Sequence, residues 1–137
     1  MDQHLITTQE DLIEEFINLR TWALVGASNN REKYGNIIFR NLREAGYHVY
    51  PVNPHATEIE GVPCYPSLAD LPEKPAVVDI VVPPQVTVEV IKECARLGIE
   101  RVWIQPGAES EEAIRTSHEL GLKVVHHRCA MKHRKRW

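Results

Sequence analysis

One pattern occurs three times in this chain: a stretch with helical spacing of apolar residues ends in a glycine, and a short apolar run follows. The glycines are Gly46, Gly98 and Gly121. Glycine at this place is typical of a helix C-terminus, where the backbone turns left-handed. The runs that follow are continuously apolar rather than alternating, which predicts strands buried on both faces. Helices that alternate with such strands predict an α/β fold with a parallel sheet between two helical layers.

The predicted strands cover residues 22–26, 48–52, 77–82, 101–105 and 122–126, with a short additional strand near Val62 to Cys64. Right-handed crossovers between parallel strands then produce a doubly wound, Rossmann-like domain with a mostly parallel sheet of five or six strands. The 137 residues have the length of one domain, so we expect residues 1–137 to form a single unit. In this architecture a ligand lies at the carboxyl ends of the strands.

Both ends of the chain carry a recognisable segment. In the N-terminal segment 1–20, Thr7 and Glu10 have the spacing of a capping box and predict a helix over roughly residues 8–19. The C-terminal tail 128–137 is basic, although the whole chain has a net charge of −3. We expect this tail to be solvated or to contact ligand phosphates. Its cations are Arg128, Lys132, Arg134, Lys135 and Arg136.

The turn after the first strand has the composition of a phosphate-binding loop. A glycine at the end of a parallel strand lets the backbone approach an anion, and the N–H groups and dipole of the next helix attract it. Polar and basic residues follow this glycine, which predicts a nucleotide-type ligand with a pyrophosphate. The alternative is a simple connection between strand and helix. The predicted contact residues are Gly26, Ala27, Ser28, Asn29, Asn30, Arg31 and Lys33.

The same turn argues against NAD. A dinucleotide fingerprint has the form G-x-G-x-x-G, followed about 20 residues later by an acid that holds the ribose. Here Ser28 and Arg31 fill the second and third glycine positions, and the second strand ends in residues 53–55, Asn-Pro-His, without a carboxylate. Hydroxyl, amide and cationic groups suit a ligand with several phosphates.

The order of features from Trp22 to Met131 resembles the coenzyme A binding protein family, which has the fold of the N-terminal domain of the succinyl-CoA synthetase alpha subunit. Five motifs in the same order carry the resemblance. It implies that the ligand is coenzyme A. The motifs are Val25-Gly26-Ala27-Ser28, residues 46–54, residues 78–84, residues 103–108, and Arg128-Cys129.

The resemblance also implies a role for residues at four strand ends. It implies that residues 28–31 bind phosphates and that Asn53, Pro54 and His55 face the ligand, with His55 where the family often has lysine. Val82, Pro83 and Pro84 would line the adenine or the start of the pantetheine arm, although proline is also common where a helix begins. Ile104, Gln105 and Pro106 match a strand end that touches coenzyme A, with Pro106 in place of a glutamate. Cys129 would lie near the far end of the ligand.

Other reactive side chains have structural interpretations. Asp79 lies inside an apolar strand, and we expect it to be a structural acid with a hydrogen-bond partner. Cys64 and Cys94 are expected in the core. His126, His127, Cys129 and His133 are residue types that bind metals, but adjacent histidines on a strand point to opposite faces. We therefore assign no metal site and no catalytic residue.

The predicted function is that of a small cytoplasmic protein that binds coenzyme A or acyl-CoA as a carrier, sensor or regulatory partner. Three scattered cysteines indicate reduced thiols, and no run of 18 apolar residues predicts a membrane span. The alternatives are an acyl-CoA transferase or thioesterase that uses Cys129 with His126 or His127, and an NAD(P)-binding regulatory domain. A nucleic-acid partner is not expected, because the basic tail lacks interleaved aromatic residues; a homodimer or a protein partner stays open.

Overall fold

The computed structural model describes residues 7–137, and it contains alternating helices and strands as the sequence predicts. One short 3-10 helix, Leu68–Asp70, lies between the fourth and fifth strands. The strands are β1 (Thr21–Val25), β2 (His48–Val52), β3 (Glu58–Ile59), β4 (Val62–Pro63), β5 (Val77–Ile80), β6 (Arg101–Ile104) and β7 (Lys123–His126). The helices are α1 (Gln9–Ile17), α2 (Tyr34–Glu44), α3 (Pro84–Arg96), α4 (Glu111–Glu119) and α5 (Ala130–His133).

The main sheet has five parallel strands in the order β2-β1-β5-β6-β7. This order confirms the doubly wound fold, with the reversal of strand order between β1 and β5. The expected additional strand exists but is not a sixth strand of this sheet. It is β4, which pairs antiparallel with β3 because Glu60 and Gly61, with φ of 48° and 81°, form a two-residue hairpin turn.

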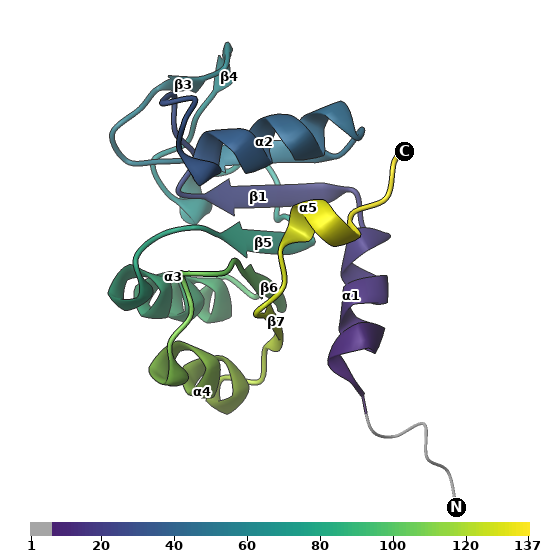
Figure 1. Cartoon of the computed structure of the whole chain (residues 1–137). Helices are drawn as coiled ribbons and strands as arrows, with labels where there is room; N and C mark the ends of the chain where they lie inside the picture. The colour runs from purple at the N-terminus through teal and green to yellow at the C-terminus, as the bar shows by residue number, and fades with distance from the viewer. Residues whose placement is uncertain (1–6) are drawn as a thin grey trace, which may run out of the picture.

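Alternate residues of each strand enter two separate cores. In β1, Trp22 and Leu24 pack with helices α1, α2 and α5, whereas Ala23 and Val25 pack with α3 and α4. Figure 1 shows α3 and α4 together at lower left, away from α2 and α5. Burial on both faces explains why the strands read as continuous apolar runs. The three cap glycines have φ between 74° and 98°, as predicted for helix ends.

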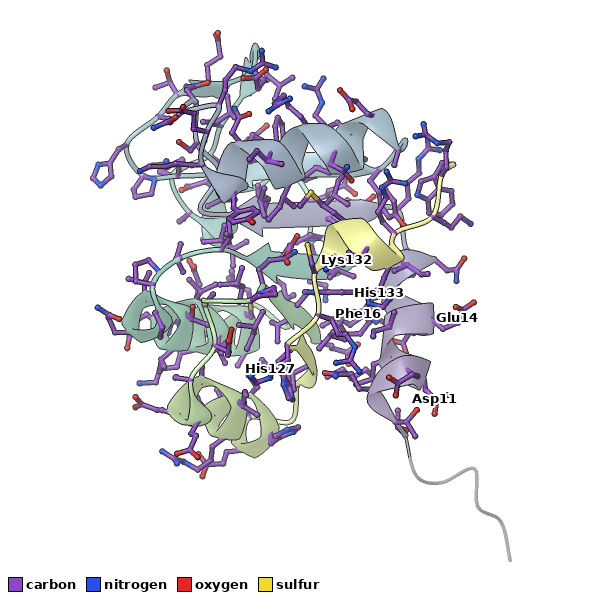
Figure 2. The ribbon with its side chains drawn as sticks, in the orientation of Figure 1. Asp11, Glu14, Phe16, His127, Lys132 and His133 are labelled. Atoms are coloured by element: carbon purple, nitrogen blue, oxygen red, sulfur yellow. The ribbon has the colours of Figure 1, made fainter. Side chains whose placement is uncertain are left out.

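Helix α1 begins one residue later than predicted. Its capping box uses Thr8 and Asp11, not Thr7 and Glu10: the Asp11 N–H donates to Thr8 Oγ1, and the Thr8 N–H donates to Asp11 Oδ2, both at 3.1 Å. Aspartate fills the position that a capping box usually gives to glutamate, so the residue pattern selected the wrong threonine. Phe16 points from α1 toward the sheet and packs 6.3 Å from the Trp103 ring (Figure 2). Residues 1–6 of the predicted N-terminal segment lie outside the described residues.

The basic tail is neither free in solvent nor, at its end, near the carboxyl ends of the strands. The Trp137 N–H donates to the Ala45 carbonyl at 2.7 Å, and the Trp137 ring packs edge-on against Tyr47. The Lys135 ammonium lies 3.9 Å from the centre of the Trp137 ring, a cation–π contact. The tail therefore docks beside the end of α2, where β1 begins; Figure 1 shows the C-terminus at the opposite end from the tip of the β1 arrow. The expected contact between the tail and ligand phosphates stays a prediction.

Hydrogen bonds from outside the main sheet occupy part of each of its outer strands. Beside β2, the Tyr65 N–H donates to the Pro51 carbonyl at 3.0 Å and the Asn53 N–H donates to the Tyr65 carbonyl at 2.9 Å. On β7, the His126 N–H donates to the side-chain oxygen of Gln9 in α1 at 2.8 Å. Within residues 7–137, no helix is long and apolar enough to cross a membrane.

Candidate functional site

Three backbone segments meet where the strand order reverses. Gly26 follows β1 with φ +103°, and a side chain there would collide with the carbonyl oxygen of Val81 after β5. Gly35, in the first turn of α2, has the same restriction against the Gly26 carbonyl. Both glycines are therefore required for backbone packing, whatever binds nearby. This crossing fixes the turn at the carboxyl end of the sheet.

The turn between β1 and α2 covers residues 26–33, because α2 does not begin until Tyr34. Ala27 is fully buried, so only its backbone is available to a ligand. The N–H groups of Ala27, Ser28 and Asn29 have no hydrogen-bond acceptor within residues 7–137. Unpaired N–H groups in a turn before a helix are the usual components of an anion cradle.

Two asparagine side chains hold this turn in place. Asn53, at the end of β2, donates to the Ala27 carbonyl at 2.8 Å, and its side-chain oxygen accepts the His55 N–H at 2.7 Å. Asn36 is completely buried in α2 and donates to the Ser28 carbonyl at 2.8 Å. Asn53 thus has a structural role, whereas Pro54 and His55 are exposed beside the turn.

The β3–β4 hairpin brings a carboxylate to the turn, which the sequence argument missed. Asn29 donates to the Glu58 carbonyl at 2.7 Å and accepts the Glu60 N–H at 3.1 Å, so it ties the hairpin to the turn. Glu60 Oε2 then lies 2.9 Å from Asn36 Nδ2 and 3.4 Å from Arg31 Nε. The end of β2 carries no carboxylate, as the sequence indicated, but the hairpin supplies one to the turn.

An apolar pocket of about 280 Å³ lies beside the turn. It brings together Gln105, Pro106 and Cys129, which the sequence predicted, from the ends of β6 and β7. Five lining residues were missed; Tyr34 and Ile38 share one face of α2 at i, i+4 spacing, and Lys132 comes from α5, where Figure 2 labels it. Tyr34 is 65% exposed, an unusual state for a large aromatic side chain next to an apolar pocket. The complete lining is Tyr34, Ile38, Val81, Gln105, Pro106, Cys129, Met131 and Lys132.

One lining residue of the pocket, Gln105, belongs to a buried polar network. Gln105 Nε2 donates to both carboxylate oxygens of Asp79, at 2.8 and 3.0 Å, and Gln105 Oε1 accepts the Ala130 N–H at 3.3 Å. Burial raises the pKa of Asp79 to about 8, although the hydrogen bond from Gln105 opposes the shift. Asp79 has the partner that the sequence argument required, and the network joins β5, β6 and α5.

The remaining predicted ligand residues lie at helix or strand ends and do not line the pocket. Pro83 is the N-cap of α3 and Pro84 its first residue, the position where proline suits a helix. Thr87 Oγ1 donates to the Val82 and Pro83 carbonyls at 3.4 and 3.3 Å. Ile104 is fully buried in β6, so its side chain belongs to the core. None of these residues lines the pocket beside Cys129.

The two adjacent histidines meet, contrary to the sequence argument. Strand alternation ends with β7 at His126, and His127 has a left-handed φ of 59°, which turns its ring back. The two Nδ1 atoms lie 2.6 Å apart, and His127 Nε2 lies 3.7 Å from Glu109. Burial and the neighbouring His127 lower the pKa of His126. Within residues 7–137, no group of three or more His, Cys, Asp or Glu residues is arranged to hold a metal ion.

All three cysteines are free thiols. Burial raises the pKa of Cys64, and it raises the pKa of Cys94 to about 12, so both behave as core residues. Cys129 is half-buried on the pocket wall. Within residues 7–137, no histidine nitrogen lies within hydrogen-bonding distance of its sulfur.

Comparison with known proteins identifies the family of this chain. A family model described as a CoA binding domain matches residues 20–135. The chain is 31% identical over 129 residues to the alpha subunit of ADP-forming acetate–CoA ligase II from Pyrococcus furiosus, which covers 86% of this chain and 28% of that protein. It is 34% identical over 117 residues to ADP-forming acetate–CoA ligase I from Archaeoglobus fulgidus, with 78% and 17% covered. The alignments thus span less than a third of either relative.

A similar solved structure has nearly the same extent as this chain. It is a hypothetical protein from Pyrococcus horikoshii OT3, with a TM-score of 0.85 and 41% identity. The alignment covers 93% of this chain and 89% of that one.

Proposed function

The chain belongs to the family of CoA binding domains, and from this premise we propose that it binds coenzyme A or an acyl thioester of coenzyme A at the carboxyl end of its sheet. The observation that carries the proposal is the position of two complementary surfaces beside one another. A polar turn with unpaired N–H groups lies next to an apolar pocket that contains a thiol. Coenzyme A has matching parts, a pyrophosphate and a long, weakly polar arm that ends in sulfur.

The pyrophosphate is assigned to the turn between β1 and α2. The N–H groups of Ala27, Ser28 and Asn29 supply hydrogen-bond donors, and Arg31 and Lys33 are exposed cations in the same loop. His55 stands beside the turn and adds a further donor to phosphate.

The pantetheine arm is assigned to the pocket. Tyr34 stands exposed next to this pocket, where its ring is available to cover an apolar ligand group. Cys129 and Gln105 line the pocket, which supports a position near the thiol or acyl end of the arm. Val82 and the prolines that follow it lie at the neighbouring strand end and are assigned to the adenine side.

Binding without catalysis is the form of the function that the geometry supports. A thiol nucleophile needs a base within hydrogen-bonding reach, and His126 and His127 contact each other and Glu109 rather than the Cys129 sulfur. We therefore propose a carrier, sensor or regulatory partner. Because two relatives are named as alpha subunits, we include a protein partner in the proposal. Three free thiols support the reducing cytoplasm as its location.

Isothermal calorimetry with coenzyme A, acetyl-CoA and NAD tests the ligand. We expect a binding heat with coenzyme A and with acetyl-CoA, and no binding heat with NAD. In a parallel thermal-unfolding experiment at about 100 times the dissociation constant, bound ligand stabilises the fold by about 2.7 kcal/mol. Equal stabilisation by NAD, or none by either coenzyme A species, contradicts the proposal.

A second assay separates binding from catalysis. Acetyl-CoA is incubated with the wild-type protein and with Cys129→Ser, and release of free thiol is followed with a colorimetric disulfide reagent. In both samples we expect free thiol to appear at the same rate as in a control without protein. Thiol release by the wild type that disappears in Cys129→Ser would support a thioesterase instead.

A further inference from the structure

A second cationic surface, which we call the arginine groove, lies between α2 and the β3–β4 hairpin. Its volume is about 340 Å³, and three of its five lining residues are arginines. The chain as a whole has a net charge of −3, so this concentration of guanidinium groups is local. The lining residues are Arg31, Arg40, Arg43, Glu44 and Glu60.

The guanidinium groups of the groove are held in place but have unused donors. Arg40 Nε donates to the side-chain oxygen of the buried Asn36 at 2.6 Å, which fixes the arginine through one nitrogen. Arg43 lies over the Phe39 ring at 5.3 Å. Within residues 7–137, the terminal nitrogens of Arg40 and all side-chain nitrogens of Arg43 have no hydrogen-bond acceptor. Planar, oriented guanidinium groups with free donors suit a phosphate monoester.

The groove is continuous with the phosphate turn through shared residues. Arg31 belongs to the turn and also lines the groove. The Asn36 amide donates to the Ser28 carbonyl in the turn and to Glu60 in the groove. A ligand with two separate phosphate groups can therefore place one on each side of Arg31. Coenzyme A has such a pair, a pyrophosphate and a monoester on the 3′ position of the same ribose.

We propose that the arginine groove binds the 3′-phosphate of coenzyme A and makes this domain selective for coenzyme A over dephospho-CoA. The inference rests on the proposed function, because it assigns a second part of the same ligand. The proposal also predicts that Glu60 affects the affinity for the ligand. Its carboxylate contacts Arg31 at 3.4 Å and is an anion at the place that the monoester approaches, so it opposes binding of the phosphate.

Calorimetry with coenzyme A and dephospho-CoA, which differ only in the monoester, tests this inference. For the wild type we expect the dissociation constant of dephospho-CoA to be about tenfold higher, the effect of one charge-assisted contact. Arg43→Gln should bring the ratio of the two dissociation constants close to one without weakening the binding of dephospho-CoA. The matched control is Arg96→Gln, which removes the same charge from the exposed last turn of α3 and should keep the wild-type ratio.

A second pair of variants examines the carboxylate. Glu60→Gln should tighten coenzyme A binding several-fold more than dephospho-CoA binding. Glu58→Gln, on the same hairpin but exposed, should change neither ratio nor affinity by as much. Circular dichroism of each variant confirms that the fold is intact.

The possible results separate the two levels of the proposal. A wild-type ratio near one, or an unchanged ratio in Arg43→Gln, overturns the assignment of the groove while coenzyme A binding stands. If the wild type binds neither ligand, the proposed function fails and the groove assignment fails with it.

Discussion

The carboxyl group of Asp79 should make the stability of this protein fall as pH rises from about 4 to about 8. Asp79 is fully buried, and its only side-chain partner among the described residues is the Gln105 amide. Burial raises the folded-state pKa to about 8, whereas an aspartate in an unfolded chain has a pKa of about 3.9. The folded state therefore holds a proton that the unfolded state releases. The stabilisation is complete below the unfolded pKa and is lost as pH rises through the folded pKa.

The size of this effect follows from the difference between the two pKa values. Between pH 5 and pH 8 the unfolded carboxyl is ionised, so the free energy of unfolding falls by about 1.4 kcal/mol per pH unit, or about 4 kcal/mol in total. Asparagine has no such dependence. Its extra N–H group would lack a partner beside Gln105, which costs about 1–3 kcal/mol at every pH. Asp79→Asn should therefore be less stable than the wild type at pH 5 and more stable at pH 8.

Urea unfolding of both proteins at pH 5, 6.5 and 8 measures the difference. Subtraction removes contributions common to both proteins, including His126, whose lowered pKa acts with the opposite sign below about pH 6.5. Asp70→Asn, an exposed acid, is the control and should track the wild type. If the difference between wild type and Asp79→Asn changes by less than about 1 kcal/mol from pH 5 to pH 8, Asp79 is ionised in the fold and the reasoning fails.

Three further predictions concern the site. Gly35→Ala should lower the free energy of unfolding by at least about 2 kcal/mol in urea, because its side chain meets the Gly26 carbonyl; an unchanged midpoint would mean that the turn is not closely packed. Replacing Arg31 and Lys33 together with alanine should weaken coenzyme A binding and flatten its salt dependence in calorimetry, and normal binding at low and high salt would place phosphate recognition elsewhere. Oxidised coenzyme A should form a mixed disulfide with Cys129 that intact-mass measurement detects, that dithiothreitol reverses and that Cys129→Ser abolishes; labelling of another cysteine would mean that the arm points away from the pocket.

The parallel sheet was predictable because its signals are local. Continuous apolar runs and glycine-terminated helices report burial and chain reversal within a few residues, and both features are present. The strand near Val62 was also detected, but its partner was not. Pairing with β3 depends on a hairpin turn at Glu60, a residue that rarely adopts the left-handed backbone.

Contacts between segments that are far apart in the sequence could not be predicted from it. Nothing near Trp137 indicates that it packs on Tyr47, because the contact joins residues 90 positions apart and forms only in the folded chain. Glu60 reaches the turn between β1 and α2 for the same reason. In the pocket, Gln105 and Cys129 were predicted through the family resemblance. Tyr34 was not, since an exposed aromatic residue at the start of a helix has no periodic signal.

The hydrogen bonds at the outer strands also limit how this domain can associate. An open strand edge is a template on which a second chain can aggregate or add a strand. Here Tyr65 pairs beside the end of β2, and the Gln9 side chain takes the last N–H of β7. Growth of the sheet from one molecule into the next would have to displace these groups. Assembly with another subunit is therefore expected to use side chains on helices and loops, which leaves the sheet at five strands.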